Sequence, residues 1–221
     1  PPPPAVLVWR AKGWRTTRQC LPSLRRCRCP RAGTPWRARL FEESVRGELE
    51  ALELGCHLYP INSIGYGGVH ANFIEALDWL LPGDDAAVIA RLEAFPAQSE
   101  QYQQLLRAGV AAGKVASAAM VRKVPETLAA LEAELDGDGG PVGARVAAVA
   151  PAAAGRAAAA KASFRAAVAG LRRFLEAEYI PHARQSEGCA GLPDGDKLYE
   201  ACLRFHTTTA MTPAEITPRG S

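Results

Sequence analysis

Three stretches of the sequence carry polar residues that could do chemistry, and the first is a glycine-rich loop. Residues 59–70 have the sequence YPINSIGYGGVH, with Gly65, Gly67 and Gly68 shortly before His70. Glycine adopts backbone conformations that are closed to other residues, so the loop could present amide groups to an anion ahead of the next helix. No strand precedes it and it matches no phosphate-binding fingerprint, so a tight connector packed on the core is the favoured interpretation.

The second stretch, residues 178–199, is rich in polar and turn-forming residues. Glu178, His182 and Glu187 follow one another at spacings of four and five residues, which could place metal ligands on one helix face. Pro181 interrupts the face that would join them, because proline breaks the helical hydrogen-bond ladder. The sequence therefore favours a solvated helix end over a metal site.

The third stretch, residues 204–216, has the sequence RFHTTTAMTPAEI. His206 stands beside three threonines and could line a cleft; the alternative is a histidine that satisfies helix-end carbonyls and the helix dipole. His70 and His206 are our two candidates for a substrate cleft. No catalytic residue and no metal ligand is assigned.

A helix-start pattern follows at Thr212, Pro213 and Glu215. The Thr212 hydroxyl is expected to accept a hydrogen bond from the Glu215 amide, while the Glu215 carboxylate accepts one from the Thr212 amide. Pro218 comes two residues after Ile216. The sequence thus predicts the opening of a helix that it does not extend.

Other catalytic and metal-binding patterns are missing from the sequence. It contains no HExxH and no GxSxG motif. Cys20, Cys27 and Cys29 lack the second pair of ligands that a zinc site needs, and no histidine lies near them. The other cysteines fall on or beside apolar segments, so we expect reduced core residues of an intracellular protein: Cys56, Cys189 and Cys202.

Charge divides the chain near position 39. Of 26 Lys and Arg against 23 Asp and Glu, ten basic residues and no acid lie in residues 1–39, so the remainder carries a net charge of −7. Residues 1–38 are therefore predicted to be a basic segment rich in Pro, Arg and Cys that is either disordered or not homologous to the domain that follows. An organelle transit peptide and a nucleic-acid-binding arm remain alternatives, the second disfavoured.

From residue 39 onward the apolar residues recur at helical spacing, and no alternating strand pattern of useful length is found. The segments that predict helices are 39–54, 70–81, 82–95, 96–114, 117–135, 144–163, 164–181 and 191–206. Pro125 is expected to kink or divide one of them. The fold class is thus all-α, a multi-helix array. No apolar run reaches the length that spans a bilayer, so we expect a soluble protein inside the cell or an organelle.

The same regions resemble the domain of unknown function family 885. The resemblance covers residues 39–216 and rests on "RLFEESVRGELEALELGCHLYPINSIGYGGVHANF", "RLEAFPAQSEQYQQLLRAGVAAGKV" and "FLEAEYIPHAR…GLPDGDKLYEACLRFHTTTAMTPAEI". It implies a mostly helical, metallopeptidase-like protein of the gluzincin type, a zinc-dependent hydrolase acting on peptide bonds. The zinc-binding residues of that family follow the threonine-rich motif, where this sequence has only residues 217–221, an aberrant end.

The resemblance therefore implies the front half of a larger fold, without catalytic zinc or activity of its own. Its implied partner is a peptide substrate of the complete protein. The alternative is a non-catalytic helical binding module. Losing half of a fold uncovers apolar surface, so self-association is a further expectation.

Overall fold

The computed structural model describes residues 35–58, 60, 83–137 and 139–216, with side chains from residue 39 onward. All regular elements in these ranges are helices, and one isolated bridge pairs Ser117 with Arg184. The predicted all-α class is confirmed. The chain divides into two units, residues 1–58 with 186–221 (unit 1) and residues 59–185 (unit 2). None of the described helices is both long and apolar enough to cross a membrane.

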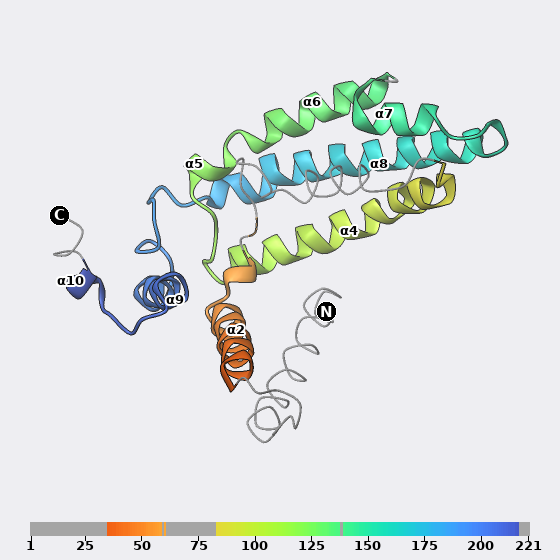
Figure 1. The fold of residues 1–221 in the computed structure, drawn as a ribbon. Helices are drawn as coiled ribbons and strands as arrows, with labels where there is room; N and C mark the ends of the chain where they lie inside the picture. The colour runs from red at the N-terminus through yellow and green to blue at the C-terminus, as the bar shows by residue number, and fades with distance from the viewer. Residues whose placement is uncertain (1–34, 59, 61–82, 138, 217–221) are drawn as a thin grey trace. The chain divides into compact units, whose positions relative to one another are not determined.

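Unit 2 is a bundle of long helices (Figure 1). Helix α8 (Ala154–Phe174) lies between α4 (Asp85–Ala111) on one side and α6 (Val124–Asp136) with α7 (Gly140–Ala147) on the other. The short helix α5 (Ala118–Val121) precedes α6. Proline separates α5 from α6 as predicted, since Pro125 stands in the first turn of α6, where its missing N–H costs no hydrogen bond.

The apolar stripes of these helices meet in one core. The stripe predicted on α8 is wholly buried, with Phe164, Val168, Leu171 and Leu175 each at most 1% exposed. Phe164 packs against Phe95 of α4, their ring centroids 4.5 Å apart. Helix α8 begins in the alanine-rich stretch that offers little to pack by itself, and small side chains there let neighbouring helices approach closely.

Helix α4 corrects one prediction. The sequence suggested two helices, 82–95 and 96–114, because Pro96 looked like a first-turn residue. The structure shows one helix that passes through Pro96. An interior proline costs about 3 kcal/mol, but Leu92 and Phe95 before it and Leu106 after it are fully buried, so core packing holds the two halves in line. Asp84 caps the helix by accepting a hydrogen bond from the Ala87 amide, 3.1 Å.

Helix α8 continues into a π-helical turn, η4 (Leu175–Tyr179), and a 3-10 turn, η5 (Ile180–His182). The π turn ends on Tyr179, which is fully buried. Its hydroxyl accepts a hydrogen bond from the Ala116 amide at 3.0 Å. Arg184 extends this connection, since its amide donates to the Ala116 carbonyl and its guanidinium to the Val115 carbonyl. The segment after α8 is thereby fixed to the loop after α4.

Ion pairs join distant segments on the surface of unit 2. Arg107 makes two hydrogen bonds to the Glu178 carboxylate, 2.8 and 3.0 Å, and its guanidinium carbon lies 4.6 Å from the centroid of the Phe174 ring. Three more arginines pair with carboxylates of other helices or helix ends: Arg156 with Glu93, Arg165 with Asp136, and Arg172 with Glu132. These pairs favour one orientation of the helices, because the planar guanidinium of arginine and the planar carboxylate form directional hydrogen bonds.

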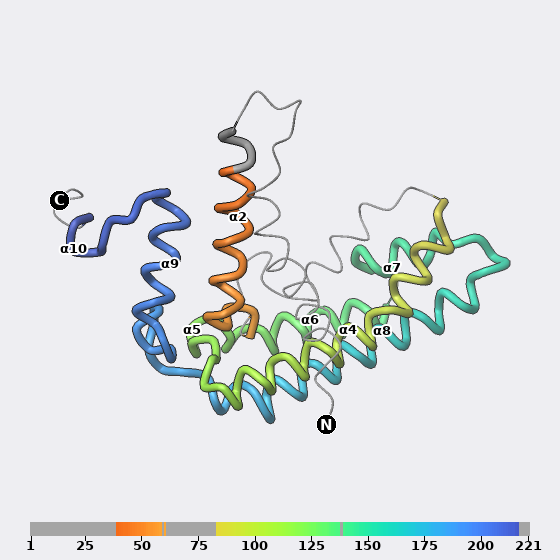
Figure 2. Tube along the Cα trace, turned by 90° about the horizontal axis from the view of Figure 1, so that it is seen from below, coloured from red at the N-terminus to blue at the C-terminus, as the bar shows by residue number. Residues whose placement is uncertain are grey.

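Unit 1 contains α2 (Pro35–Glu53), η1 (Cys56–Leu58), α9 (Gly195–Thr207) and α10 (Pro213–Ile216). Helices α2 and α9 lie side by side (Figure 2). The predicted apolar stripes are buried only in part, because among the described residues α2 and α9 pack mainly on each other. Leu49 and Leu198 are buried, whereas large apolar side chains of both helices stay exposed: Leu40, Phe41, Tyr199 and Phe205.

The three cysteines of unit 1 that the structure describes are not core residues, contrary to the sequence-based expectation. Cys56 and Cys189 are half-buried, Cys202 is exposed, and all three carry free thiols. The expectation assumed that an apolar stripe is a buried stripe. On α9 that assumption holds for Leu198 but not for Cys202 or Phe205.

The helix start at Thr212 forms in part as predicted. The Glu215 carboxylate accepts a hydrogen bond from the Thr212 amide at 2.8 Å, and it lowers the Glu215 pKa. The Thr212 hydroxyl does not accept from the Glu215 amide but donates to the same carboxylate, 2.9 Å. Helix α10 ends at Ile216.

Candidate functional site

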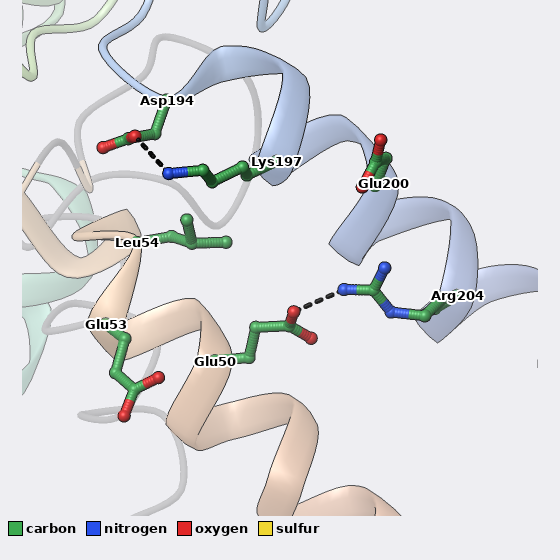
Figure 3. A pocket seen from close by; sticks show the side chains of 7 residues that line it. All are labelled: Glu50, Glu53, Leu54, Asp194, Lys197, Glu200 and Arg204. Carbon is green, nitrogen blue, oxygen red and sulfur yellow. Dashed lines mark hydrogen bonds and ion pairs between the residues drawn. The ribbon is translucent and has the colours of Figure 1, made fainter. Parts of the chain in front are cut away.

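A charged cavity lies between α2 and α9 within unit 1 (Figure 3). Its volume is about 320 Å³ and it opens to solvent. The lining side chains are Glu50, Glu53, Leu54, Asp194, Lys197, Glu200 and Arg204. This is the cavity that we take as the candidate site.

Helical spacing explains why these residues share one cavity. On α9, Lys197, Glu200 and Arg204 follow one another at intervals of three and four residues, which places them on one helix face. On α2, Glu50 and Glu53 are three residues apart. The two faces oppose each other in Figure 3, and Glu50 and Arg204 point toward one another.

Two ion pairs organise the lining. Arg204 on α9 donates a hydrogen bond to the Glu50 carboxylate on α2, and Lys197 bonds to the Asp194 carboxylate at 3.0 Å. All four side chains keep at least 39% of their surface exposed, so solvent screens the pairs and they add little to stability. Their role is to hold charges of both signs at fixed places around the cavity.

The lining carries four carboxylates against two cations and one apolar side chain. A ligand that fits this pattern has polar groups of both signs, with positive charge favoured. Peptides have this character, since a chain carries amide donors and acceptors, ends of opposite charge and ionic side chains. Of the described residues, those that line the cavity include no hydroxyl or thiol that could act as a nucleophile.

The part of the chain that the structure describes does not place either of the two predicted cleft histidines in the cavity. His70 lies outside them. His206 lies on α9 and is exposed, with its ring set edge-on against Phe205, 5.1 Å between centroids at 87°, and it is not a lining residue of the cavity. Both assignments stay predictions, as does the interpretation of the glycine-rich loop 59–70, which apart from residue 60 lies outside the described residues.

The predicted solvated helix end at 178–187 is confirmed. Glu178 pairs with Arg107, and the pairing lowers the pKa of that carboxyl. His182 lies in η5 and is exposed, and Glu187 is exposed too. The turn geometry introduced by Pro181 is the physical reason, because η5 ends the helix before the three residues can share a face.

The zinc that the family resemblance implies does not fit the part of the chain that the structure describes. There, no three side chains of His, Cys, Asp or Glu are grouped so that they could hold a metal ion. A catalytic zinc needs three protein ligands and an open position. We derive no metal chemistry from these residues.

Sequence reasoning did not single out any of the cavity residues. The local spacing on α9 was available in the sequence, but charged faces of this kind are usually only solvated. What makes this face a site is the Glu50–Arg204 pair, which joins residues 154 positions apart. A single sequence contains nothing that predicts such a long-range pairing.

The comparisons with known proteins give one match. The family described as "Bacterial protein of unknown function (DUF885)" matches residues 10–221. The chain belongs to this family. No curated protein and no solved structure matches it. The match to DUF885 begins inside the basic N-terminal segment and includes both units.

Proposed function

We propose that this DUF885 chain is the non-catalytic helical portion of a zinc-dependent hydrolase of the gluzincin type, and that its own contribution is to hold peptide substrate at the α2–α9 cavity. The chemistry of peptide cleavage takes place elsewhere in the complete protein. The observation that carries the proposal is the cavity lining, in which four carboxylates and two cations surround an open volume of about 320 Å³.

Three further points support the proposal. The family resemblance implies a peptidase-like protein. The described residues that line the cavity include no hydroxyl or thiol side chain. The described residues offer no metal ligands in a usable arrangement. A part that binds substrate without cleaving it is consistent with all three.

The experiment measures peptide binding by fluorescence anisotropy with the full chain. The probes are labelled hexapeptides of four kinds: lysine-containing, glutamate-containing, one with both, and a neutral Gly-Ser peptide. We expect the peptides that contain lysine to bind, and Glu200→Gln to weaken that binding about tenfold, because one carboxylate of the lining is lost. Equal affinity for all four peptides would contradict the proposal.

Matched controls lie on the same two helices. Asp196→Asn on α9 and Glu48→Gln on α2 remove one exposed carboxylate each without touching the cavity lining. They are expected to bind the lysine peptides as the native chain does. If these controls weaken binding as much as Glu200→Gln, the attraction is a general effect of net charge and not of the cavity.

Catalysis is tested separately on the same protein. The chain is incubated with one equivalent of zinc, dialysed and analysed for bound metal, and its activity on unfolded casein is followed. We expect neither stoichiometric zinc nor cleavage. Tight one-to-one zinc accompanied by hydrolysis would overturn the non-catalytic assignment.

A non-catalytic binding module that associates through apolar surface is the second candidate, and one observation favours it. Phe41 and Phe205 are 56% and 64% exposed on the two helices of unit 1, and large exposed apolar side chains mark interaction sites when they gather. Sedimentation velocity over a range of concentrations tests self-association. Oligomers that disappear in Phe41→Ser/Phe205→Ser would support this function, and a monomer at every concentration would count against it.

A further inference from the structure

One carboxylate in the lining of the α2–α9 cavity is left available by its neighbours. Arg204 donates a hydrogen bond to Glu50 across the cavity. Lys197 donates one to Asp194 at 3.0 Å. Glu200 forms neither a hydrogen bond nor an ion pair with any residue that the structure describes. It is exposed, so a ligand from solvent can reach its carboxylate.

The position of Glu200 on α9 gives it two possible partners on its own helix. Lys197 lies three residues before it and Arg204 four residues after it, spacings at which a cation can pair with a glutamate. Both cations instead pair with other carboxylates. Figure 3 shows Glu200 between them on α9. Its negative charge is therefore available to a cation that comes from outside the protein.

The apolar side chain of the lining comes from the end of α2. Leu54 directly follows α2, and its amide donates to the Glu50 carbonyl at 2.9 Å. Gly55 then turns the chain with a φ of 73°, a conformation that favours glycine and ends the helix there. Figure 3 shows the Leu54 side chain between those of Lys197 and Glu50. An apolar contact surface thus lies in the same cavity as the available carboxylate.

A ligand that complements both features carries a positive charge on an aliphatic stem. The ammonium of lysine is a compact charge with three donors, and its four methylenes can lie along an apolar surface. The α-amine of a peptide has no such stem, because it is attached directly to the backbone. A neutral side chain of the same length has no charge. The carboxylate and the leucine together therefore distinguish lysine from both.

We propose that the cavity binds a lysine side chain of its peptide ligand, with the ammonium on Glu200 and the aliphatic stem on Leu54. This inference rests on the proposed function, since it names the side chain by which the peptide is held. Glu200 determines the charge that is accepted, and Leu54 determines the length of the stem. The two ion pairs of the lining occupy the neighbouring cations of α9, which leaves Glu200 to the ligand.

The test measures competition against the labelled lysine hexapeptide, with the full chain. The competitors are unlabelled peptides acetyl-Gly-Ser-X-Ser-Gly-amide in which X is lysine, ornithine, diaminobutyrate or norleucine. A fifth competitor has norleucine at X and a free N-terminal amine. We expect affinity to fall about threefold for each methylene removed from the lysine stem, slightly less than complete burial would give. Both norleucine peptides are expected to bind at least about tenfold more weakly than the lysine peptide.

Equal affinity for lysine, ornithine and diaminobutyrate would overturn the assignment of the stem to Leu54. A norleucine peptide with a free amine that competes as well as the lysine peptide would overturn the choice of a side-chain ammonium. The five competitors thus separate the two sources of an ammonium group that a peptide offers.

Variants of Leu54 test the stem contact. Leu54→Ala is expected to remove the difference between lysine and ornithine, whereas Leu54→Met, which keeps an apolar side chain, is expected to retain it. A merely structural role would weaken both peptides by the same factor and leave their ratio unchanged. Leu52→Ala is the matched control, because Leu52 is also half-buried at the end of α2 but does not line the cavity.

Variants of Glu200 test the charge. Glu200→Gln is expected to remove the preference for lysine over norleucine, and Glu200→Asp is expected to keep it. If the labelled lysine peptide does not bind at all, the proposed function fails together with this inference. If it binds but Leu54→Ala keeps the native preference for lysine over ornithine, this inference alone fails, and the cavity holds peptides through charge.

Discussion

The two units use similar amphipathic helices with different results. In unit 2, the stripe of α8 is entirely buried because α4 lies on one side of it and α6 with α7 on the other. In unit 1, the stripes of α2 and α9 are buried at Leu49 and Leu198 and exposed at Leu40 and Phe205. The difference shows that the periodicity of apolar residues determines which face of a helix is apolar. The helices packed around it determine how much of that apolar face is buried.

The largest expected effect tests this contrast with the same substitution in each unit. Phe164→Ala in α8 is expected to lower the free energy of unfolding by about 3–5 kcal/mol, because it leaves a cavity opposite Phe95. Phe205→Ala in α9 removes the same ring from a position that is 64% exposed, and less than about 0.5 kcal/mol is expected. Urea unfolding followed by circular dichroism measures both.

An equal loss of unfolding free energy in the two variants would contradict the contrast between the units, because Phe205 would then contribute as much to packing as a core residue. Hydrogen exchange adds a second measurement. Phe164→Ala is expected to reduce amide protection in α4, α6 and α8 together, since they share one core. Loss confined to α8 would contradict a shared core.

Two tyrosines in unit 2 are expected to show an intermediate change in the free energy of unfolding. Tyr179→Phe removes the acceptor of the buried Ala116 amide and is expected to cost about 1–3 kcal/mol. Tyr102→Phe is the matched control, since the Tyr102 hydroxyl is buried and accepts or donates no hydrogen bond to any described residue. That control is expected to be neutral or stabilising, again by urea unfolding. A loss in Tyr102→Phe as large as in Tyr179→Phe would show that the hydroxyl has a partner.

The ion pairs are expected to contribute less to the free energy of unfolding than the buried tyrosine. Arg172 and Glu132 are 27% and 13% exposed, against 43% and 39% for Arg204 and Glu50. A double-mutant cycle with Arg172→Met and Glu132→Gln is expected to give a larger coupling than one with Arg204→Met and Glu50→Gln, because solvent screens the second pair more. Both couplings should shrink in high salt. A stronger coupling for the pair in unit 1 would reverse the comparison.

The smallest effect concerns pH. Hydrogen bonds from Arg156, Arg165 and Arg107 lower the pKa values of Glu93, Asp136 and Glu178 in the folded protein. As the pH falls, these carboxylates are therefore protonated in the unfolded chain before they are protonated in the folded protein. The ion pairs stabilise the fold fully above the ordinary pKa values of 4.5 for Glu and 3.8 for Asp. This stabilisation is lost as the pH falls through the lowered pKa values of the folded protein.

The urea midpoint is expected to be flat between about pH 7 and pH 5 and to decline below about pH 4.5. Glu93→Gln/Asp136→Asn/Glu178→Gln should flatten the decline. An unchanged decline in this triple variant would assign the acid sensitivity to other carboxylates.

The elements of the fold were largely predictable from the sequence because they depend on local patterns. The stripe of Phe164, Val168 and Leu171 and the interruption of a helix at Pro125 are both visible within a few residues. The continuity of α4 through Pro96 was not, because it depends on packing against α8 that offsets the local cost of proline.

The candidate site was less predictable than the fold. The cavity depends on Glu50 and Arg204, which come from the two separate segments of unit 1 and are 154 residues apart in the sequence. This feature arises from a tertiary contact, and periodic patterns carry no information about it.

The π turn at the end of α8 fixes the register of the segment that follows it in unit 2, up to Arg184. A π turn holds one more residue than an α turn would, and each residue of an α-helix turns the chain by about 100°. Deleting one residue between Leu175 and Tyr179 would therefore restore a regular α-helix. It would also rotate Tyr179 by about 100° around the helix axis, so that its hydroxyl could no longer accept the hydrogen bond from the Ala116 amide.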